Sequence, residues 1–175
     1  MKKALILGGG GFIGSHMIQA LKNRDYWVRG VDIKFPEFNQ KIIADQFLLL
    51  DLRDKSQFME AIEDSDSFKK TIEFDEIYQF AANMGGMGHI SKYQFDILVD
   101  NLLINLNAVD LAIKSKAKKY LFSSSACIYP DDIQNRIDAN PLRESDAFPS
   151  ELKDSYGWEK LTTERLVECA IKEHS

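Results

Sequence analysis

Cysteine and long apolar runs are both scarce in this sequence. Its 175 residues include only two cysteines, Cys127 and Cys169, which is too few for a disulfide framework and is typical of a reducing compartment. No apolar run reaches the roughly 20 residues that a membrane-spanning helix needs. The first apolar run ends at the glycines of 8–11, without the cleavage site of a secretory signal. We therefore expect a cytoplasmic protein with no membrane partner.

Positive charge is also in short supply. The chain has 22 Lys and Arg against 27 Asp and Glu, a net charge of -5, and this disfavours nucleic acid as a partner. A chain of this length, 45% hydrophobic, can bury about 70% of its unfolded surface in one domain. It needs neither a metal ion nor a disulfide to fold, and we expect no metal site.

Short apolar runs alternate with stretches of helical period along the chain. Strands are expected at 3–7, 27–31, 46–50, 77–80 and 120–122, and helices at 12–22, 95–116 and 154–173. A further helix is expected to carry Leu52, Phe58, Ala61 and Ile62, while 35–45 and 130–149 read as loops. This alternation predicts an α/β fold, a Rossmann-type doubly wound parallel sheet with helices on both faces. The last helix should lead to a sixth strand, so we expect a chain truncated before that strand and before a substrate domain.

A glycine motif joins the first strand to the first helix. Gly8, Gly11 and Gly14 are spaced G-x-x-G-x-x-G around Phe12 and Ile13, and such glycines let the backbone approach a pyrophosphate at the helix N-terminus. Asp32 ends the second strand, where a carboxylate accepts hydrogen bonds from an adenosine ribose. The alternative is a merely flexible glycine run. The combined pattern predicts that residues 1–175 form one dinucleotide-binding domain.

Asp32 also bears on the choice of dinucleotide. A carboxylate about 4 Å from a 2′-phosphate costs about 4 kcal/mol per charge pair, which favours NAD over NADP, although Arg29 and Lys34 could soften that repulsion. Asp51 and Leu52 follow the third strand and are candidate adenine contacts. Asp51 is equally suited to capping the next helix.

Tyr156 and Lys160 lie four positions apart on the last predicted helix, so their side chains share one face. A neighbouring ammonium should lower the pKa of the phenol toward neutral pH and make Tyr156 an acid/base for a hydroxyl that loses hydride. Any surface helix can carry this pair by chance. Here the serines of 123–125 end the preceding strand, at the sheet edge where such folds bind ligands.

Together with Ala81-Ala82 after the fourth strand, these features resemble the extended short-chain dehydrogenase/reductases, the NAD-dependent epimerases and dehydratases. The resemblance covers essentially the whole chain and is most detailed toward GDP-mannose 3,5-epimerases. Four stretches carry it: AANMGGMG at 81–88, SSACIYP at 124–130, ESDAFP at 144–149 and YGWEK at 156–160.

The resemblance implies NAD as cofactor and a nucleotide-sugar, such as GDP-mannose, as substrate. Ser125, Tyr156 and Lys160 would be the catalytic triad. Tyr156 would take the C4 hydroxyl proton of the sugar while NAD takes the hydride, which gives a transient 4-ketone. Cys127 would exchange the protons that the ketone acidifies, although a cysteine beside a strand is often only packing. Ala81 and Ala82 would contact the cofactor.

The glycine-rich stretch after the fourth strand is implied to line the sugar pocket through Gly85, Gly86 and Met87, with Asn101 as an anchor behind it. The sequence departs from the epimerase pattern at Asn83, where Asp is expected, and at His89, where Phe is expected. The family's second acid/base, a lysine, would lie beyond Ser175.

Two alternatives remain open. A GDP-sugar 4-dehydrogenase or 4-epimerase would use Tyr156 and Lys160 with Cys127 as a bystander, and a catalytically incomplete module would bind NAD alone. The predicted helix 95–116 carries apolar residues on more than one side, so more than one side should be covered. A homodimer through 95–116 and 154–173 is implied by the family, and cover from a C-terminal part is the alternative.

Overall fold

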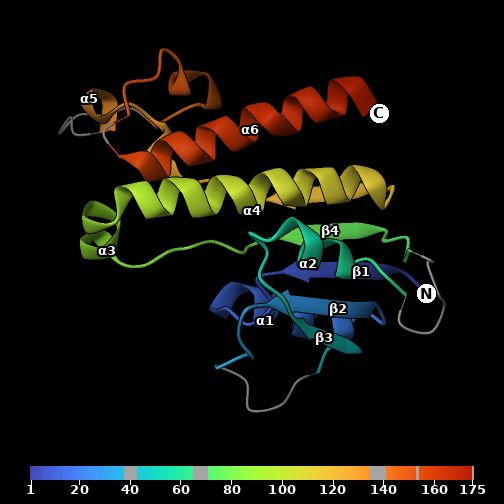
Figure 1. Cartoon of the computed structure of the whole chain (residues 1–175). Helices are drawn as coiled ribbons and strands as arrows, with labels where there is room; N and C mark the ends of the chain where they lie inside the picture. The colour runs from blue at the N-terminus through green and yellow to red at the C-terminus, as the bar shows by residue number, and fades with distance from the viewer. Residues whose placement is uncertain (38–42, 65–70, 135–140, 153, 175) are drawn as a thin grey trace.

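The fold is built on one five-stranded parallel sheet, seen in a computed structural model (Figure 1) that describes residues 1–37, 43–64, 71–134, 141–152 and 154–174. The strands are β1 (Lys3–Leu7), β2 (Trp27–Asp32), β3 (Gln46–Leu49), β4 (Glu76–Gln79) and β5 (Lys119–Phe122). Their order is β3-β2-β1-β4-β5, with every neighbouring pair parallel. The chain therefore reverses its direction of winding between β1 and β4, and the predicted α/β fold is confirmed.

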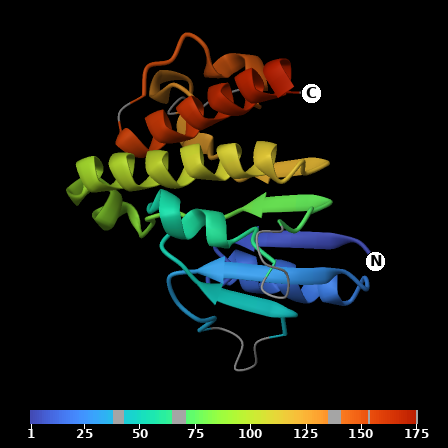
Figure 2. The same cartoon turned by 45° about the vertical axis from the view of Figure 1, so that its right-hand side comes forward.

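Helices cover both faces of the sheet. The longer ones are α1 (Phe12–Lys22), α4 (Gln94–Lys114) and α6 (Ser155–His174), and the shorter ones are α2 (Lys55–Glu60), α3 (Met87–Lys92) and α5 (Asp131–Gln134), with 3-10 turns η1 (Ala126–Ile128) and η2 (Glu144–Ala147). Helix α1 packs on one face, whereas α2 and α4 lie on the other (Figure 2). Helix α6 packs along α4 and against η1.

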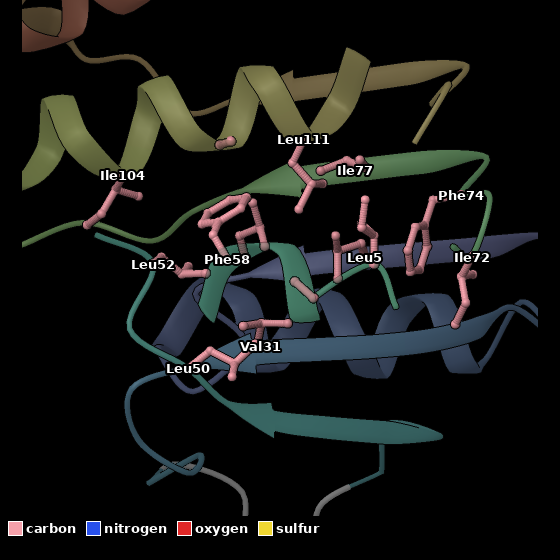
Figure 3. Close-up of a cluster of buried hydrophobic side chains, with 14 residues drawn as sticks. Leu5, Val31, Leu50, Leu52, Phe58, Ile72, Phe74, Ile77, Ile104 and Leu111 are labelled. Atoms are coloured by element: carbon pink, nitrogen blue, oxygen red, sulfur yellow. The ribbon is translucent and has the colours of Figure 1, made fainter. Parts of the chain in front are cut away.

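The larger core lies between the sheet and the pair α2 and α4 (Figure 3). Leu5 and Ile77 from the sheet meet Phe58 of α2 and Leu111 of α4, and all four are at most 2% exposed. The smaller core places Ile18 of α1 over the opposite face. Because both faces are covered, the central strand is a continuous apolar run, with Ala4–Leu7 wholly buried. This is why the sequence located β1 correctly.

Three local expectations were wrong. Leu52 does not belong to a helix, because α2 begins only at Lys55, after Asp54 caps it by accepting a hydrogen bond from the Ser56 amide at 2.8 Å. Helix α3 was missed in the glycine-rich stretch. The expected loop over 130–149 contains α5 and η2, and its residues 135–140, like 38–42 of the other loop, lie outside the described residues.

Candidate active site

A cavity of about 830 Å³ opens at the carboxyl ends of the strands, where the sheet changes its winding direction. This edge lies at the left of Figure 2, toward which the strand arrows point. Every residue predicted to bind the cofactor lines the cavity: Gly8, Gly11, Phe12, Ile13, Gly14, Asp32, Asp51, Leu52, Ala81, Ala82, Tyr156 and Lys160. Segments far apart in the sequence therefore meet around one space.

The glycine turn is packed too tightly for side chains. Gly8 has a φ of +85°, and a Cβ there would lie 2.5 Å from the Ala81 amide nitrogen. A Cβ at Gly14 would overlap the Gly8 carbonyl oxygen. Among the described residues no side chain caps α1, and its first turn holds no acidic residue. The N-terminal end of α1 is thus suited to the pyrophosphate of NAD, because its amides and dipole favour an anion there.

Asp32 stands at the rim of this turn. Its carboxylate accepts hydrogen bonds from the Gly10 amide at 2.9 Å and the Lys34 amide at 3.2 Å. The suggestion that Arg29 could soften repulsion of a 2′-phosphate is wrong. Arg29 is 1% exposed and donates to the carbonyls of Ala61 and Glu63 instead. The residues present thus fit NAD.

The part of the cavity lined by Asp51 and Leu52 contains an arginine that the sequence did not predict as a site residue. Arg53 forms an ion pair with Asp51 at 2.7 Å and with Asp100 of α4 at 3.1 Å. The hydrogen bond from Arg53 holds the pKa of Asp51 below its usual value. Asp51 is therefore not a helix cap, while Leu52 and Arg53 both line the cavity. Arg53 had no motif to reveal it, since its partner Asp100 is distant in sequence.

Tyr156 is buried beside the cavity, 9% exposed, in a cluster with Ile90, Ile97 and Cys127. The Ser125 hydroxyl accepts a hydrogen bond from the Cys127 amide at 3.2 Å and lies close enough to the phenol to lower its pKa. The structure therefore brings three of the predicted catalytic residues together. Within the predicted serine run, Ser123 lines the cavity, whereas the Ser124 hydroxyl is buried with no partner among the described residues.

The fourth predicted catalytic residue, Lys160, is 5% exposed. Its Nζ lies 4.7 Å from the ring centroid of Phe122 and 5.3 Å from that of Tyr156. It also forms an ion pair with Glu159, with 3.3 Å between Nζ and Oε1. Burial lowers the pKa of Lys160, and the Glu159 charge opposes that effect.

The expectation that Lys160 lowers the pKa of Tyr156 is wrong for this structure. Burial raises the pKa of the phenol, the hydrogen bond with Ser125 works in the opposite direction, and the Glu159 charge raises it further. Glu159 neutralises the ammonium that was expected to favour the phenolate. At neutral pH, Tyr156 is therefore a phenol that can donate a proton.

The predicted sugar-binding residues are not on the lining of the cavity. Met84 lines the cavity, whereas Gly85, Gly86 and Met87 do not. Gly86 is the N-cap of α3, and Met87, its first residue, is 70% exposed. Ser125 and Cys127 also lie outside the lining and reach it through Tyr156.

The two departures from the epimerase pattern touch each other. His89 Nε2 lies 3.1 Å from Asn83 Oδ1, and Asn83 Nδ2 donates to Asp100 at 2.9 Å. The backbone amide of Asn83 donates to Asn101 Oδ1 at 2.6 Å, which supports the expectation that Asn101 anchors this loop.

Within the described parts of the chain, no group of three or more His, Cys, Asp or Glu residues could hold a metal ion. No helix in those parts is long and apolar enough to cross a membrane.

Comparison with known proteins gives the same picture. The chain is 39% identical to GDP-mannose 3,5-epimerase of Arabidopsis thaliana over 97% of this chain and 45% of the plant enzyme. It is 36% identical to GDP-mannose 3,5-epimerase 1 of Oryza sativa subsp. indica over 96% of this chain and 42% of that enzyme. The chain thus spans less than half the length of these relatives.

Among solved structures, the fold matches UDP-glucose 4-epimerase of Thermus thermophilus in complex with NAD. The TM-score is 0.78 at 22% identity, over 98% of this chain and 51% of the other. The model of the NAD dependent epimerase/dehydratase family matches residues 4–175. With this match, and with a cavity whose lining suits NAD, the chain belongs to the NAD dependent epimerase/dehydratase family.

Proposed function

We propose that this chain supplies the NAD-binding domain of a nucleotide-sugar epimerase that acts on GDP-mannose or a related GDP-sugar. The observation that supports this most directly is the cluster beside the cavity that brings Tyr156 and Cys127 together, with the Ser125 hydroxyl accepting from the Cys127 amide. The likeness to plant GDP-mannose 3,5-epimerases supports the choice of sugar. Residues 1–175 would be the cofactor-binding domain. The greater length of those relatives supports a separate domain that binds the sugar-nucleotide.

The residues divide the chemistry as follows. Asp32 would bind the adenosine ribose, and the N-terminal end of α1 would bind the pyrophosphate of NAD. Lys160, next to Tyr156, would hold the nicotinamide ribose. NAD, when bound, supplies the acceptor for the C4 hydride of the sugar.

Proton transfer falls to the side chains around Tyr156. Tyr156 would accept the C4 hydroxyl proton as the phenolate, the minor form that its raised pKa leaves at neutral pH, and would return the proton when the hydride comes back to C4. Ser125 would stand beside that phenol and orient the sugar hydroxyl. The resulting 4-ketone acidifies the hydrogens at C3 and C5. Cys127, which packs against the cluster that contains Tyr156, would exchange one of them, and Gly85, Gly86 and Met87 would border the sugar.

A GDP-sugar 4-epimerase or 4-dehydrogenase is the alternative that the fold favours, since the Thermus structure is a 4-epimerase. The protein that carries this chain should be incubated with GDP-mannose in heavy water. Deuterium at C3 or C5, lost in Cys127→Ser, supports the proposal. Turnover at C4 without deuterium at either carbon supports the alternative and overturns the role of Cys127.

A cofactor-binding module without catalysis is the second alternative. Calorimetry on residues 1–175 should show NAD binding and no binding of GDP-mannose. Turnover of GDP-mannose by these residues alone would contradict the division into two parts.

Both cysteines are free thiols, which supports the cytoplasmic location that we also propose.

We also propose a homodimer through α4 and α6. Phe95, Val99, Leu103 and Leu106 form an exposed apolar stripe along α4. Helix α6 lies beside α4 (Figure 1) and carries the exposed Trp158 and Ile171. Apolar side chains at this spacing are typical of helices that pack against further helices.

A further inference from the structure

One buried carboxylate has no part in the chemistry described above. Glu159 lies between Lys160 and α4 and is 0% exposed. Burying a carboxylate is costly unless its oxygens accept hydrogen bonds. Here Oε1 accepts from Asn101 Nδ2 at 3.1 Å and pairs with Lys160, while Oε2 accepts from Asn105 Nδ2 at 3.0 Å.

The two asparagines extend this network to the wall of the cofactor cavity. Asn101 Oδ1 accepts from the Asn83 amide, and its Nδ2 also reaches the Asn83 carbonyl at 3.2 Å. Asn105 Oδ1 accepts from Gln79 Nε2 at 2.8 Å, and Gln79 in turn bonds both backbone groups of Ala81, at 3.0 and 3.2 Å. Gln79, Ala81 and Asn83 all line the cavity.

A carboxylate is the side chain that suits this place. It only accepts hydrogen bonds, and it faces two amide NH₂ groups and an ammonium, which only donate. Each asparagine donates a hydrogen bond from its NH₂ group to Glu159, and this fixes where its oxygen points. The oxygen of Asn101 faces the Asn83 amide in the loop after β4, and the oxygen of Asn105 faces Gln79. The orientation of both amides is therefore fixed by the carboxylate.

We propose that Glu159 is a positioning residue for NAD: through Asn101 and Asn105 it holds the 79–83 segment, and directly it holds the Lys160 ammonium, in the geometry that receives the cofactor. The proposal rests on the cofactor site of the proposed function and not on the identity of the sugar. Failure of the chain to act on GDP-mannose would therefore leave it standing.

The test compares Glu159→Gln with Glu168→Gln, measuring NAD affinity by calorimetry and amide hydrogen exchange by NMR. The first variant keeps the shape but turns one acceptor into a donor that faces donors. The control makes the same change on an exposed part of α6, where Glu168 pairs with Arg165. We expect Glu159→Gln to weaken NAD binding by about tenfold to a hundredfold, and Glu168→Gln to leave it unchanged.

Hydrogen exchange separates positioning from a general loss of stability. In Glu159→Gln the amides of Ala81 and Asn83 should exchange faster by a larger factor than those of Leu5 and Ile6 in β1, which report the core. Equal acceleration at all four amides, or NAD affinity within twofold of the unaltered chain, would overturn the proposal.

A second variant covers the case in which Glu159→Gln does not fold. Asn105→Ser removes one donor to Glu159 and leaves the contacts of Asn101 in place. It should weaken NAD binding by a smaller factor and speed exchange at Ala81 more than at Asn83. Unchanged affinity and exchange in Asn105→Ser would also contradict the proposal.

Discussion

At the scale of single residues, the site depends on which charges are already paired. Lys160 lies close to Tyr156, but its ammonium is paired with the Glu159 carboxylate. Burial therefore has the largest effect on the pKa of the phenol and raises it. Arg29, which looked available beside the cofactor, donates its hydrogen bonds to carbonyls at the end of α2. The sequence identified these residues but could not show their partners, because the pairing depends on how the helices meet.

The phenol of Tyr156 can be tested by Tyr156→Phe. The variant keeps the ring and its packing and loses only the hydroxyl that we propose exchanges the sugar proton. Turnover by the protein that carries this chain should fall by about 10²- to 10⁴-fold, while NAD affinity stays within a fewfold. Tyr26→Phe, which removes a hydroxyl bonded to Glu76 away from the cavity, is the control and should keep full turnover. Comparable turnover in both variants would exclude Tyr156 as the acid/base.

Asn83 gives a prediction about stability and pH. Asn83→Asp would replace the donor to Asp100 with a second carboxylate, and the free energy of unfolding at pH 7.5 should fall by about 1–2 kcal/mol. Repulsion in the folded state would raise the pKa of the new carboxyl above its unfolded value. The penalty should therefore be fully present above that raised pKa and fade as pH falls through it.

Urea unfolding of this variant at pH 7.5 and pH 4.5 measures the difference. The double variant Asn83→Asp/Asp100→Asn exchanges the two groups and should recover part of the lost stability. An equal loss at both pH values would show that repulsion between carboxylates is not the cause.

At the scale of helices and strands, close backbone approach decides where the site forms. Gly157 stands on α6 one residue after Tyr156, and a Cβ there would overlap the Cys127 carbonyl oxygen. This glycine lets α6 approach η1, and that approach brings Tyr156 to Ser125. The sequence showed Gly157 within YGWEK but could not show which backbone it meets.

Gly157→Ala and Gly88→Ala form a matched pair, because both glycines lie inside helices. Alanine is about 1 kcal/mol better than glycine in a helix, and a Cβ at Gly88 would have nothing within 4 Å. Gly88→Ala should therefore raise the free energy of unfolding by up to about 1 kcal/mol. Gly157→Ala should lower it by about 1–3 kcal/mol, the range for overpacking, and weaken NAD binding. Chemical unfolding measures both, and a gain in both variants would contradict the close approach.

Elements whose sequence pattern reflects their burial were predicted accurately, and elements that depend on distant contacts were not. All five strands, β1 to β5, were located to within one residue at either end, because a covered parallel strand is a short apolar run. Helix α3 was missed because its first residues include glycine. Leu52 was misplaced because its apolar side chain is buried at the cavity and not on a helix. Arg53 and Glu159 were missed as site residues because their roles come from distant partners.

At the scale of the whole molecule, α4 separates the cofactor site from an exposed apolar surface. Its inner side carries Asn101 and Asn105, and its outer side carries Leu103 and Leu106. The sequence predicted a helix covered on more than one side, and α6 and the sheet cover two of them. The stripe that remains exposed is the surface assigned to a second copy of the chain.

Leu103→Lys tests that assignment. An ammonium in the middle of an apolar interface would be buried without a partner, so the variant should sediment as a monomer at concentrations where the unaltered chain is a dimer. Leu121→Lys is the matched control, since Leu121 on β5 is 43% exposed and Leu103 is 42% exposed. The control should leave the sedimentation coefficient unchanged. A dimer that survives Leu103→Lys would move the interface elsewhere.

If the proposed homodimer forms through α4, this helix would link cofactor binding to self-association. Asn101 and Leu103 are two residues apart on the same helix. An interaction that fixes the position of α4 against the 79–83 segment therefore also fixes the position of the exposed apolar stripe. Linkage between two equilibria is reciprocal. If dimerisation stabilises the position of α4, the affinity for NAD should rise with protein concentration. Saturating NAD should in turn promote dimerisation.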